Sequence, residues 1–465
     1  MNSPFLFGRR TIYTDYAEIT PNNVVQVLQR ALTVHSINRA EIDYLYNYRR
    51  GIHPILQRVK KVRAEINNKI VENRADEITS FKTGYLVGEP VQYVGRNADD
   101  KADEIAMFNE FMRLENKAKS DKELADWFYT CGVAYRMSLP NTSEDPEESP
   151  FKIYVLDPRT TFIVRYSGLG NDPKLGVMGV QYETGRVKWC CYASNAYYEI
   201  ENGEIVKYLP MYLGRIPIIE YSANLPKLGA FETVIPLIDA LNLTASNRVD
   251  GIEQFIQALL MFKGVDIDSE DYASLKEQGA IKVSVDGDVK YLIQELNQQQ
   301  TQVVVDYMYQ TILTICGMPN RNGGSSTSDT GTAVIMRDGW ESAEARAKDT
   351  ETLFKASENE FIKLAVTITN TLRGTKLKAA DIEPRLTRRN YENIQQKAQI
   401  LTTMLANDKV HPKLGFEYCG MFVDPEYAYK ISMDYYEQRR AKTLKELKEK
   451  IGNNEGDGGQ IIDGE

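Results

Sequence analysis

The sequence has few of the residues on which most catalytic and metal sites are built. Its 465 residues include three histidines, His35, His53 and His411, whose spacing fits neither a zinc site nor a catalytic triad. Its five cysteines contain no CxxC pair, so we expect them to be reduced packing residues. They are Cys131, Cys190, Cys191, Cys316 and Cys419. We therefore expect no catalytic residue, no metal site and no cofactor.

Long apolar runs are also missing. No stretch approaches the roughly 18 apolar residues of a membrane-spanning helix. The N-terminus, MNSPFLFGRRTIYTDY, lacks an apolar core followed by a small-residue cleavage site. These absences predict a protein that is made in a cytoplasm, stays there and does not enter a membrane.

Residues 316–340, CGMPNRNGGSSTSDTGTAVIMRDGW, combine two adjacent glycines with a run of hydroxyl side chains. Such a stretch invites comparison with a phosphate-binding loop. That loop needs a lysine for the phosphates, and residues 316–340 contain none. The missing lysine nearly excludes a nucleoside triphosphate site here, and a surface loop between two helices is the simplest alternative.

Periodicity divides the chain into helical and β-rich regions, which predicts an α+β, mainly helical fold. Residues 151–221 are rich in β-branched and aromatic side chains and contain an Asn202-Gly203 turn, which indicates mostly antiparallel strands. Residues 237–264 and 298–318 read as two helices on either side of a short acidic unit. We expect these helices to run antiparallel, with the acidic unit at their far end. A longer helix is predicted over 331–374.

Charge is distributed unevenly. Residues 237–319 hold twelve acidic and five basic side chains, a net charge of -7, whereas the whole chain has -9. The simplest explanation is a solvated surface. The acidic pairs Asp266/Asp268 and Asp286/Asp288 suit a divalent metal, although acids in turns seldom bind one. The basic stretch 48–74 is compatible with nucleic acid, but a solvated or subunit-facing surface is the stronger interpretation.

The order of these parts resembles a known family. The segments YNYRRGIHPIL and NNKIVENRADEITSFKTGYLVGEPVQY are similar to the N-terminal signature of portal proteins of tailed double-stranded DNA bacteriophages, of the type found in siphophages of Gram-positive hosts. GRIPIIEYSAN, followed by FETVIPLIDALNLTASNRVDGIEQF, resembles that family's entry into its first stem helix. The Gly/Ser stretch before a long helix resembles its tunnel loop and wing helix. The resemblance covers roughly residues 41–450.

The resemblance implies a portal fold of wing, stem, clip and crown that assembles as a ring around a central channel. Carried onto this chain, it gives these parts: wing 1–236 together with the long wing helix 331–374, stem helices 237–264 and 298–318, clip 265–297, tunnel loop 319–330, crown 375–452 and a disordered acidic tail 453–465.

The same resemblance implies a function without catalysis. About a dozen copies would form a ring at one capsid vertex, and double-stranded DNA would pass through it during packaging and ejection. The implied partners are the terminase large subunit and head-completion (adaptor) proteins at the clip, and scaffold and major capsid protein at the wing. The ring would be assembled in the host bacterial cytoplasm and reside in the virion.

Three groups of candidate site residues follow from this assignment. The tunnel loop comprises Asn320, Arg321, Asn322, Gly323, Gly324, Ser325, Ser326, Thr327, Ser328 and Asp329. The stem residues expected to line the channel are Asp250, Glu253, Gln257 and Asp306. The clip residues expected to bind the motor and adaptor are Asp268, Glu270, Asp271, Lys276, Glu277, Asp286 and Asp288.

Physical chemistry supports this assignment. A ring of basic side chains would bind many phosphates and hold DNA in place, whereas an acidic channel lets it slide. Gly323 and Gly324 permit the conformations that a moving collar requires. Ser328 or Asp329 is a candidate cap for the helix that follows. Two alternatives stay open: a metal-dependent enzyme acting on DNA, and a capsid-assembly scaffold that never contacts DNA.

Overall fold

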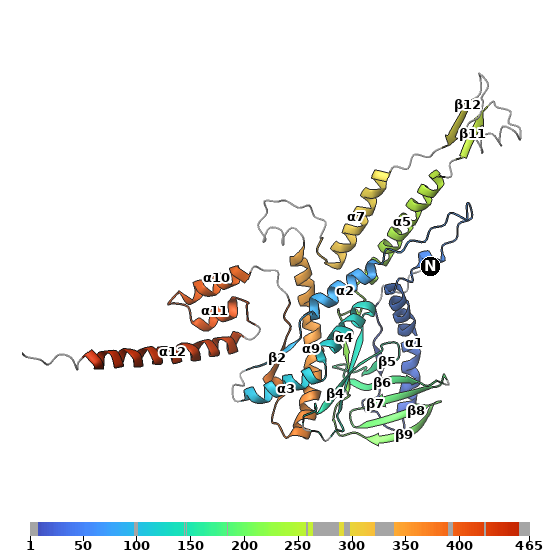
Figure 1. The fold of residues 1–465 in the computed structure, drawn as a ribbon. Coiled ribbons are helices and arrows are strands. Elements are labelled where there is room, and N and C mark those ends of the chain that lie inside the picture. Colours follow the sequence, from blue (N-terminus) through green and yellow to red (C-terminus); the bar gives the residue numbers. More distant parts are fainter. Residues whose placement is uncertain are drawn as a thin grey trace, which may run out of the picture.

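The computed structural model describes residues 8–96, 101–143, 145, 147–183, 185–256, 259–263, 288–292, 298–320, 339–388, 394–422 and 425–454. Figure 1 shows a central body of helices and sheets. Two helices, α5 (Ile235–Ile256) and α7 (Gln298–Cys316), project from it on one side, and a smaller helical group lies on another side. The mixed helix and sheet content agrees with the expected α+β class.

Four helices form the N-terminal part of the body. The apolar positions of the first recur at helical spacing, and Val24, Val27, Leu28 and Ala31 are all buried. The second helix begins where the side chain of Asn73 accepts a hydrogen bond from the Asp76 amide. The helices are α1 (Val24–Arg49), α2 (Arg74–Val87), α3 (Ala102–Leu114) and α4 (Lys117–Cys131), with the short helix η2 (Pro54–Gln57) between α1 and α2.

The two larger sheets of the described chain lie in the body. The larger has the order β1-β5-β6-β7-β8-β9 and is antiparallel except that β1 runs parallel to β5. The smaller has the order β10-β3-β4. The antiparallel region predicted over 151–221 is confirmed, and the N-terminal segment adds its parallel edge. The strands are β1 (Ile12–Thr14), β3 (Ala134–Pro140), β4 (Phe151–Leu156), β5 (Thr161–Tyr166), β6 (Pro173–Gln181), β7 (Val187–Tyr192), β8 (Ala196–Glu201), β9 (Glu204–Pro210) and β10 (Ile218–Tyr221).

One long helix, α9 (Trp340–Arg373), runs through the middle of the body. Its buried side chains, among them Phe354, Phe361 and Ile368, share one apolar core with α3, α4 and the smaller sheet. This confirms the long helix predicted over 331–374 from its first described residue onward. Residues 331–338 lie outside the described part of the chain.

A cluster of buried charges joins α9 to the rest of the body. Glu358 of α9 pairs with Arg136 of β3 at 2.8 Å and with Lys117 of α4 at 2.9 Å. Asp121 of α4 pairs with the same two cations, at 2.6 Å from Lys117. All four side chains are almost completely buried. We call these four residues the buried charge cluster.

Two tyrosines add hydrogen bonds to Glu358 of this cluster. The hydroxyls of Tyr93 and Tyr221 donate to the two carboxylate oxygens of Glu358, at 2.6 and 2.8 Å. Burial alone would raise the pKa of Glu358, but the charges of Lys117 and Arg136 outweigh it and lower the pKa. The carboxylate therefore stays ionised, and helix, strand and α4 are held in one arrangement.

The C-terminal part divides in two. After the short helix η5 (Ala379–Asp381), β13 (Ile382–Arg385) pairs antiparallel with β2 (Gln92–Gly95) and so belongs to the body. The predicted crown range begins at 375, so its first residues lie with the body instead. The remaining helices, α10 (Ile394–Leu405), α11 (Pro412–Tyr418) and α12 (Pro425–Asn454), form the separate helical group in Figure 1.

We expect Arg136→Met to destabilise the protein strongly. Removing one partner of a buried ion pair leaves its partner charges uncompensated, at a cost of about 3–5 kcal/mol. The free energy of unfolding would be measured by urea titration at fixed protein concentration.

The matched control is Arg215→Met, because Arg215 also pairs with α9, at 3.4 Å from Glu360, but both side chains are about half exposed. That pair is expected to contribute about 0–1 kcal/mol. Equal losses in the two variants would contradict the role assigned to the buried charge cluster.

Candidate functional site

The α5–α7 pair carries the two stretches that the sequence singled out. The two helices run antiparallel, and the strand pair β11 (Leu259–Lys263) and β12 (Asp288–Leu292) lies at their far end. This confirms the predicted arrangement. The predicted helix 237–264 is too long, because α5 ends at Ile256 and Leu259–Lys263 pairs with β12 instead. The predicted helix 298–318 matches α7 closely.

One face of α5 is polar and covered by another part of the chain. Asp239, Asn242, Ser246 and Asp250 recur every three or four residues and therefore share a face of the helix. Asn242, Ser246 and Asp250 contact residues 51–73, which connect α1 to α2 and which we call the strap. Asp239 instead accepts from the Tyr48 hydroxyl of α1. Figure 1 shows α5 between the strap and α7.

Side chains of α5 satisfy the backbone of the strap. The amides of Asn68, Ile70 and Glu72 donate to Asp250 Oδ1, Ser246 Oγ and Asn242 Oδ1, at 2.8, 3.0 and 2.8 Å. In an extended segment every second amide points the same way. The distance between two such amides is similar to the rise of one turn of the facing helix, so successive amides reach successive turns of α5. The strap is therefore fixed to α5 much as a strand is fixed to its neighbour.

Asp250 is the strongest contact in this row. Its carboxylate accepts from Lys60 Nζ at 3.1 Å and pairs with Arg58 at 3.1 Å, in addition to Asn68. Burial alone would raise the pKa of Asp250, but the hydrogen bonds from Asn68 and Lys60 outweigh it and lower the pKa. The residue is 3% exposed. The prediction that Asp250 lines a channel is at odds with this placement, and we leave it out of the candidate lining.

The histidines serve packing and capping. His53 of the strap stacks on Tyr48 with 3.8 Å between ring centroids, and its Nδ1 accepts from Asn242 Nδ2 at 2.8 Å. Burial lowers the pKa of His53, so the ring is neutral. His35 is buried against Phe162, and His411 caps α11. All five cysteines are buried and free, as predicted.

α7 has three distinct faces. Ile312 and Leu313 are buried in the core that they share with Ile238 and Leu241 of α5. A second, polar face carries Asp306, the only charged residue of α7.

The third face of α7 points outward. Its apolar members Val303, Val304 and Tyr307 are 65%, 52% and 69% exposed. Thr311 continues this face one turn later and is half-buried. We call these four residues the outer face of α7; it has no charge.

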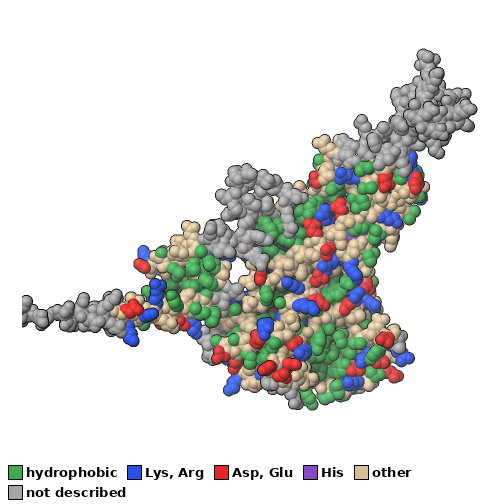
Figure 2. All heavy atoms as spheres, viewed as in Figure 1, with side chains coloured by type: hydrophobic (Ala, Val, Ile, Leu, Met, Phe, Trp, Pro, Cys, Tyr) green, Lys and Arg blue, Asp and Glu red, His purple; other side chains and the backbone are tan. Residues whose placement is uncertain are grey.

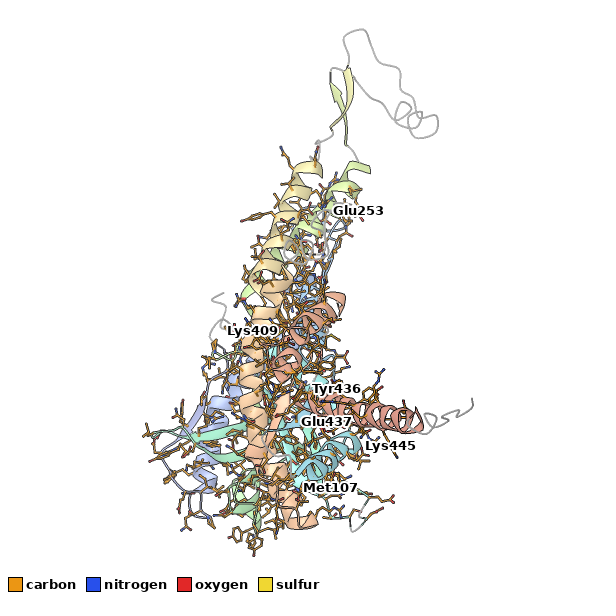
Figure 3. All side chains as sticks on the ribbon, turned by 90° about the vertical axis from the view of Figure 1, so that its left-hand side faces the viewer. Met107, Glu253, Lys409, Tyr436, Glu437 and Lys445 are labelled. Atoms are coloured by element: carbon orange, nitrogen blue, oxygen red, sulfur yellow. The ribbon has the colours of Figure 1, made fainter. Side chains whose placement is uncertain are left out.

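The candidate channel residues that the structure describes differ in their surroundings. Glu253 follows Asp250 one turn later on the same side of α5, is half-buried, and lies near the far end of the helix in Figure 3. Asp306 is exposed and accepts from Gln302, whose Oε1 accepts from Arg248 at 2.9 Å. The other candidates lie outside the described residues, except Asn320 and the backbone of Asp288: they are Gln257, Asp268, Glu270, Asp271, Lys276, Glu277, Asp286 and 321–329.

The described acids contribute less free charge than the sequence count indicates. Asp239 accepts from the Tyr48 hydroxyl at 2.9 Å, and Asp250 is neutralised by the strap. Figure 2 shows acidic and basic side chains interspersed over the α5–α7 region on the face in view. The value of -7 for residues 237–319 therefore overstates what is available to a channel.

The basic stretch 48–74 is largely used within the chain. Arg58 and Lys60 bind Asp250, Arg49 binds Asp76 and Asp126, and Arg74 binds Glu72 and Glu77. The nucleic-acid interpretation of this stretch loses its main cations. The contact between the strap and α5 was not predicted from the sequence. The pattern that indicates it is the row of polar residues at helical spacing on α5.

The two described ends of the Gly/Ser stretch lie together. A Cβ placed on Gly339 would lie 3.8 Å from the Met318 carbonyl oxygen and 3.9 Å from Pro319 Cα. Gly317 and Gly339 both have positive φ, of 62° and 81°, which favours glycine. The N-cap of α9 is Gly339. The predicted caps, Ser328 and Asp329, lie outside the described residues.

In the part of the chain that the structure describes, no group of three or more His, Cys, Asp or Glu residues is placed to hold a metal ion. Within the same ranges, no helix has both the length and the apolar character that crossing a membrane requires.

Comparison with known proteins identifies a family. A family model described as "Phage portal protein, SPP1 Gp6-like" matches residues 29–456. The portal protein of Bacillus phage SPP1 is 25% identical over 292 residues, covering 53% of this chain and 52% of that protein. The match thus spans about half the length of that relative.

Solved structures were compared as well. The neck of an empty gene transfer agent particle, computed with C6 symmetry, has a TM-score of 0.44 and 12% identity over 75% of this chain and 90% of that chain. The neck of the native particle, computed with C12 symmetry, also has a TM-score of 0.44, with 11% identity over 75% of this chain and 89% of that chain.

We expect Asp250→Ala to loosen the strap. The substitution leaves Arg58, Lys60 and the Asn68 amide without their shared acceptor, a loss of about 1–3 kcal/mol in local stability. Trypsin cleavage within the strap, after Lys60, Lys61 and Arg63, should accelerate by about tenfold or more. The control is Glu253→Ala, one turn along α5. Equal cleavage rates for the two variants would contradict the assignment.

Proposed function

The chain belongs to the family of phage portal proteins described as SPP1 Gp6-like, and we propose that copies of it close into a ring of about a dozen at one vertex of a phage capsid. Double-stranded DNA passes through the ring during packaging and ejection. The chain acts as a structural part of the virion rather than as an enzyme.

The observation that carries this proposal is the uncovered α5–α7 pair. Within one chain, the two helices bury their inner sides against each other and the body, yet the outer face of α7 stays open to solvent. Exposed, uncharged faces of this kind mark interaction sites. Repetition around an axis supplies a neighbour for every copy.

We call α5 and α7 together the hairpin. The channel is proposed to be lined by its polar side. Asp306 and Glu253 are its described carboxylates, and Gln299, Gln302 and Gln310 are exposed along α7. Amides and a few carboxylates release few counterions from DNA, so the duplex is held weakly and slides. Gln257 remains a candidate from the sequence.

The loop 319–330 is proposed as the collar around DNA. The chain leaves α7 at Cys316 and returns to α9 beside Met318 and Pro319, so the stretch begins and ends at one place at the base of the hairpin. A loop anchored in this way changes shape without moving the helices that carry it. Its hydroxyls and Arg321 supply weak, exchangeable contacts to phosphates.

The remaining assignments rest on the family. The clip, 265–297, is the proposed docking surface for the terminase large subunit during packaging and for head-completion proteins afterwards. Scaffold and major capsid protein contact the wing. Assembly takes place in the host bacterial cytoplasm, and the mature location is the portal vertex of the virion.

Native mass spectrometry of the purified chain should show a closed ring of about twelve copies. Among the described residues, none covers the outer face of α7, which gives the physical reason. A stable monomer would refute the proposal. Divalent-dependent cleavage of DNA by the purified chain would favour a nuclease, and rings that support capsid assembly without retaining DNA would favour a scaffold.

Deleting residues 323–328 should leave rings intact and impair DNA packaging or retention, because the collar loses its length while its anchors stay. Packaged DNA per particle, measured by nuclease protection, is the readout. A deletion of similar size in the exposed turn 141–148 serves as a control. Unchanged packaging after deletion of 323–328 would rule out the collar.

A further inference from the structure

The strap, α5 and α7 lie in that order across the hairpin. The row from Asn242 to Asp250 faces the strap, whereas Leu241 on the other side of α5 packs with Ile312 of α7. Figure 1 shows the same order, and in Figure 3, viewed from the left-hand side of Figure 1, α7 lies in front of α5. The two opposite sides of the hairpin therefore differ: the strap covers one side, and the outer face of α7 forms the other.

The tip of the strap presents apolar side chains to solvent. Val59 and Val62 are 83% and 77% exposed, and Ile52 and Leu56, earlier in the strap, are 57% and 40% exposed. We call these four residues the strap tip. A single exposed valine is unremarkable, but four exposed apolar side chains within eleven residues indicate an interaction surface.

Hydrogen bonds within the strap hold this patch open. Asn67 Nδ2 donates to the Arg58 carbonyl at 3.0 Å, and Lys60 Nζ donates to the Ile66 carbonyl at 2.9 Å. Ile66 is itself buried, and Asp250 fixes Lys60 from the other side. The tip therefore cannot fold back to bury Val59 and Val62, and the surface is preformed.

We propose that the strap tip of one copy packs against the outer face of α7 of the next copy. The contact is head-to-tail, because two different surfaces on opposite sides of one hairpin meet, and such a contact gives a ring when the rotation between neighbouring copies closes. The inference rests on the proposed ring and names the residues through which it closes.

A second copy suits both surfaces better than DNA does. Val59 and Val62 have nothing to offer a phosphate, and the outer face of α7 carries no charge for one. Charge at the margins is complementary as well. Lys61 and Arg63 lie next to Val62, with the single acid Glu65 further along the strap, whereas the only charged residue of α7 is Asp306, at the edge of its outer face. Apolar surfaces with opposite charges at their rims are typical of specific interfaces.

Cysteine cross-linking tests the contact directly. The five native cysteines are buried, so introduced thiols are the reactive ones. The double variant Val62→Cys with Val304→Cys, treated as assembled rings with a short bis-maleimide, should give a ladder of covalent multimers. In rings formed from an equal mixture of the two single variants, each copy carries only one introduced cysteine. Cross-linking of these rings should therefore give no product larger than a dimer.

The matched control pairs Val304→Cys with Tyr212→Cys, an exposed residue of the body, and should give no ladder. Rings that form without any ladder in the test pair would overturn this contact and leave the proposed function standing. A wild-type chain that never forms rings would overturn both.

A second variant tests the energetics. Val59→Asp combined with Val62→Asp places two unpaired charges in the proposed contact and should lower the fraction of chain in rings by about tenfold or more. Both side chains are exposed in one copy, so the thermal unfolding of the monomer should not change. The control is Val206→Asp, exposed on β9. Full ring formation by the double variant would overturn the proposal.

Discussion

The buried charge cluster is the interaction on which the architecture depends. Arg136, Lys117, Asp121 and Glu358 come from a strand and two helices, and their partners lie up to 241 positions apart in the chain. Buried ions tolerate only an arrangement in which each finds its counter-charge, so the cluster specifies how α9 crosses the sheet. The apolar core around it, with Phe354 and Phe361, stabilises the fold by burying apolar surface. It determines the orientation of α9 much less, because apolar contacts tolerate repacking.

The hairpin depends on this body through a different kind of contact. α5 and α7 share a small apolar core at their base, while further out a polar row on α5 holds the strap by hydrogen bonds. Polar contacts of this kind fix position without consuming apolar surface. Apolar side chains on the strap tip and on the outer face of α7 therefore stay available for contacts between copies.

Sequence periodicity predicted most of this framework, and its failures share one cause. The predicted helix 298–318 and the antiparallel strands of 151–221 were recovered because each pattern is local. The end of α5 was wrong because Leu259–Lys263 is fixed by pairing with β12, which lies far along the chain. Asp250 was misassigned for a related reason: spacing shows which residues share a face, whereas only the fold shows what covers that face.

The same distinction changes how the proposed channel works. A ring multiplies only the charge that each copy leaves unpaired and exposed. Asp250 is ion-paired within the chain, and Asp239 is half-buried beneath the Tyr48 hydroxyl. Along the described stem, carboxylates therefore repel DNA less strongly than the net charge counted from the sequence implied. Five of the 19 residues of α7 are glutamine, and an amide exchanges hydrogen bonds with phosphate and water at similar cost. In the proposed ring, DNA slides along the stem because the lining binds it weakly, with strong repulsion confined to whatever charge the clip and loop add.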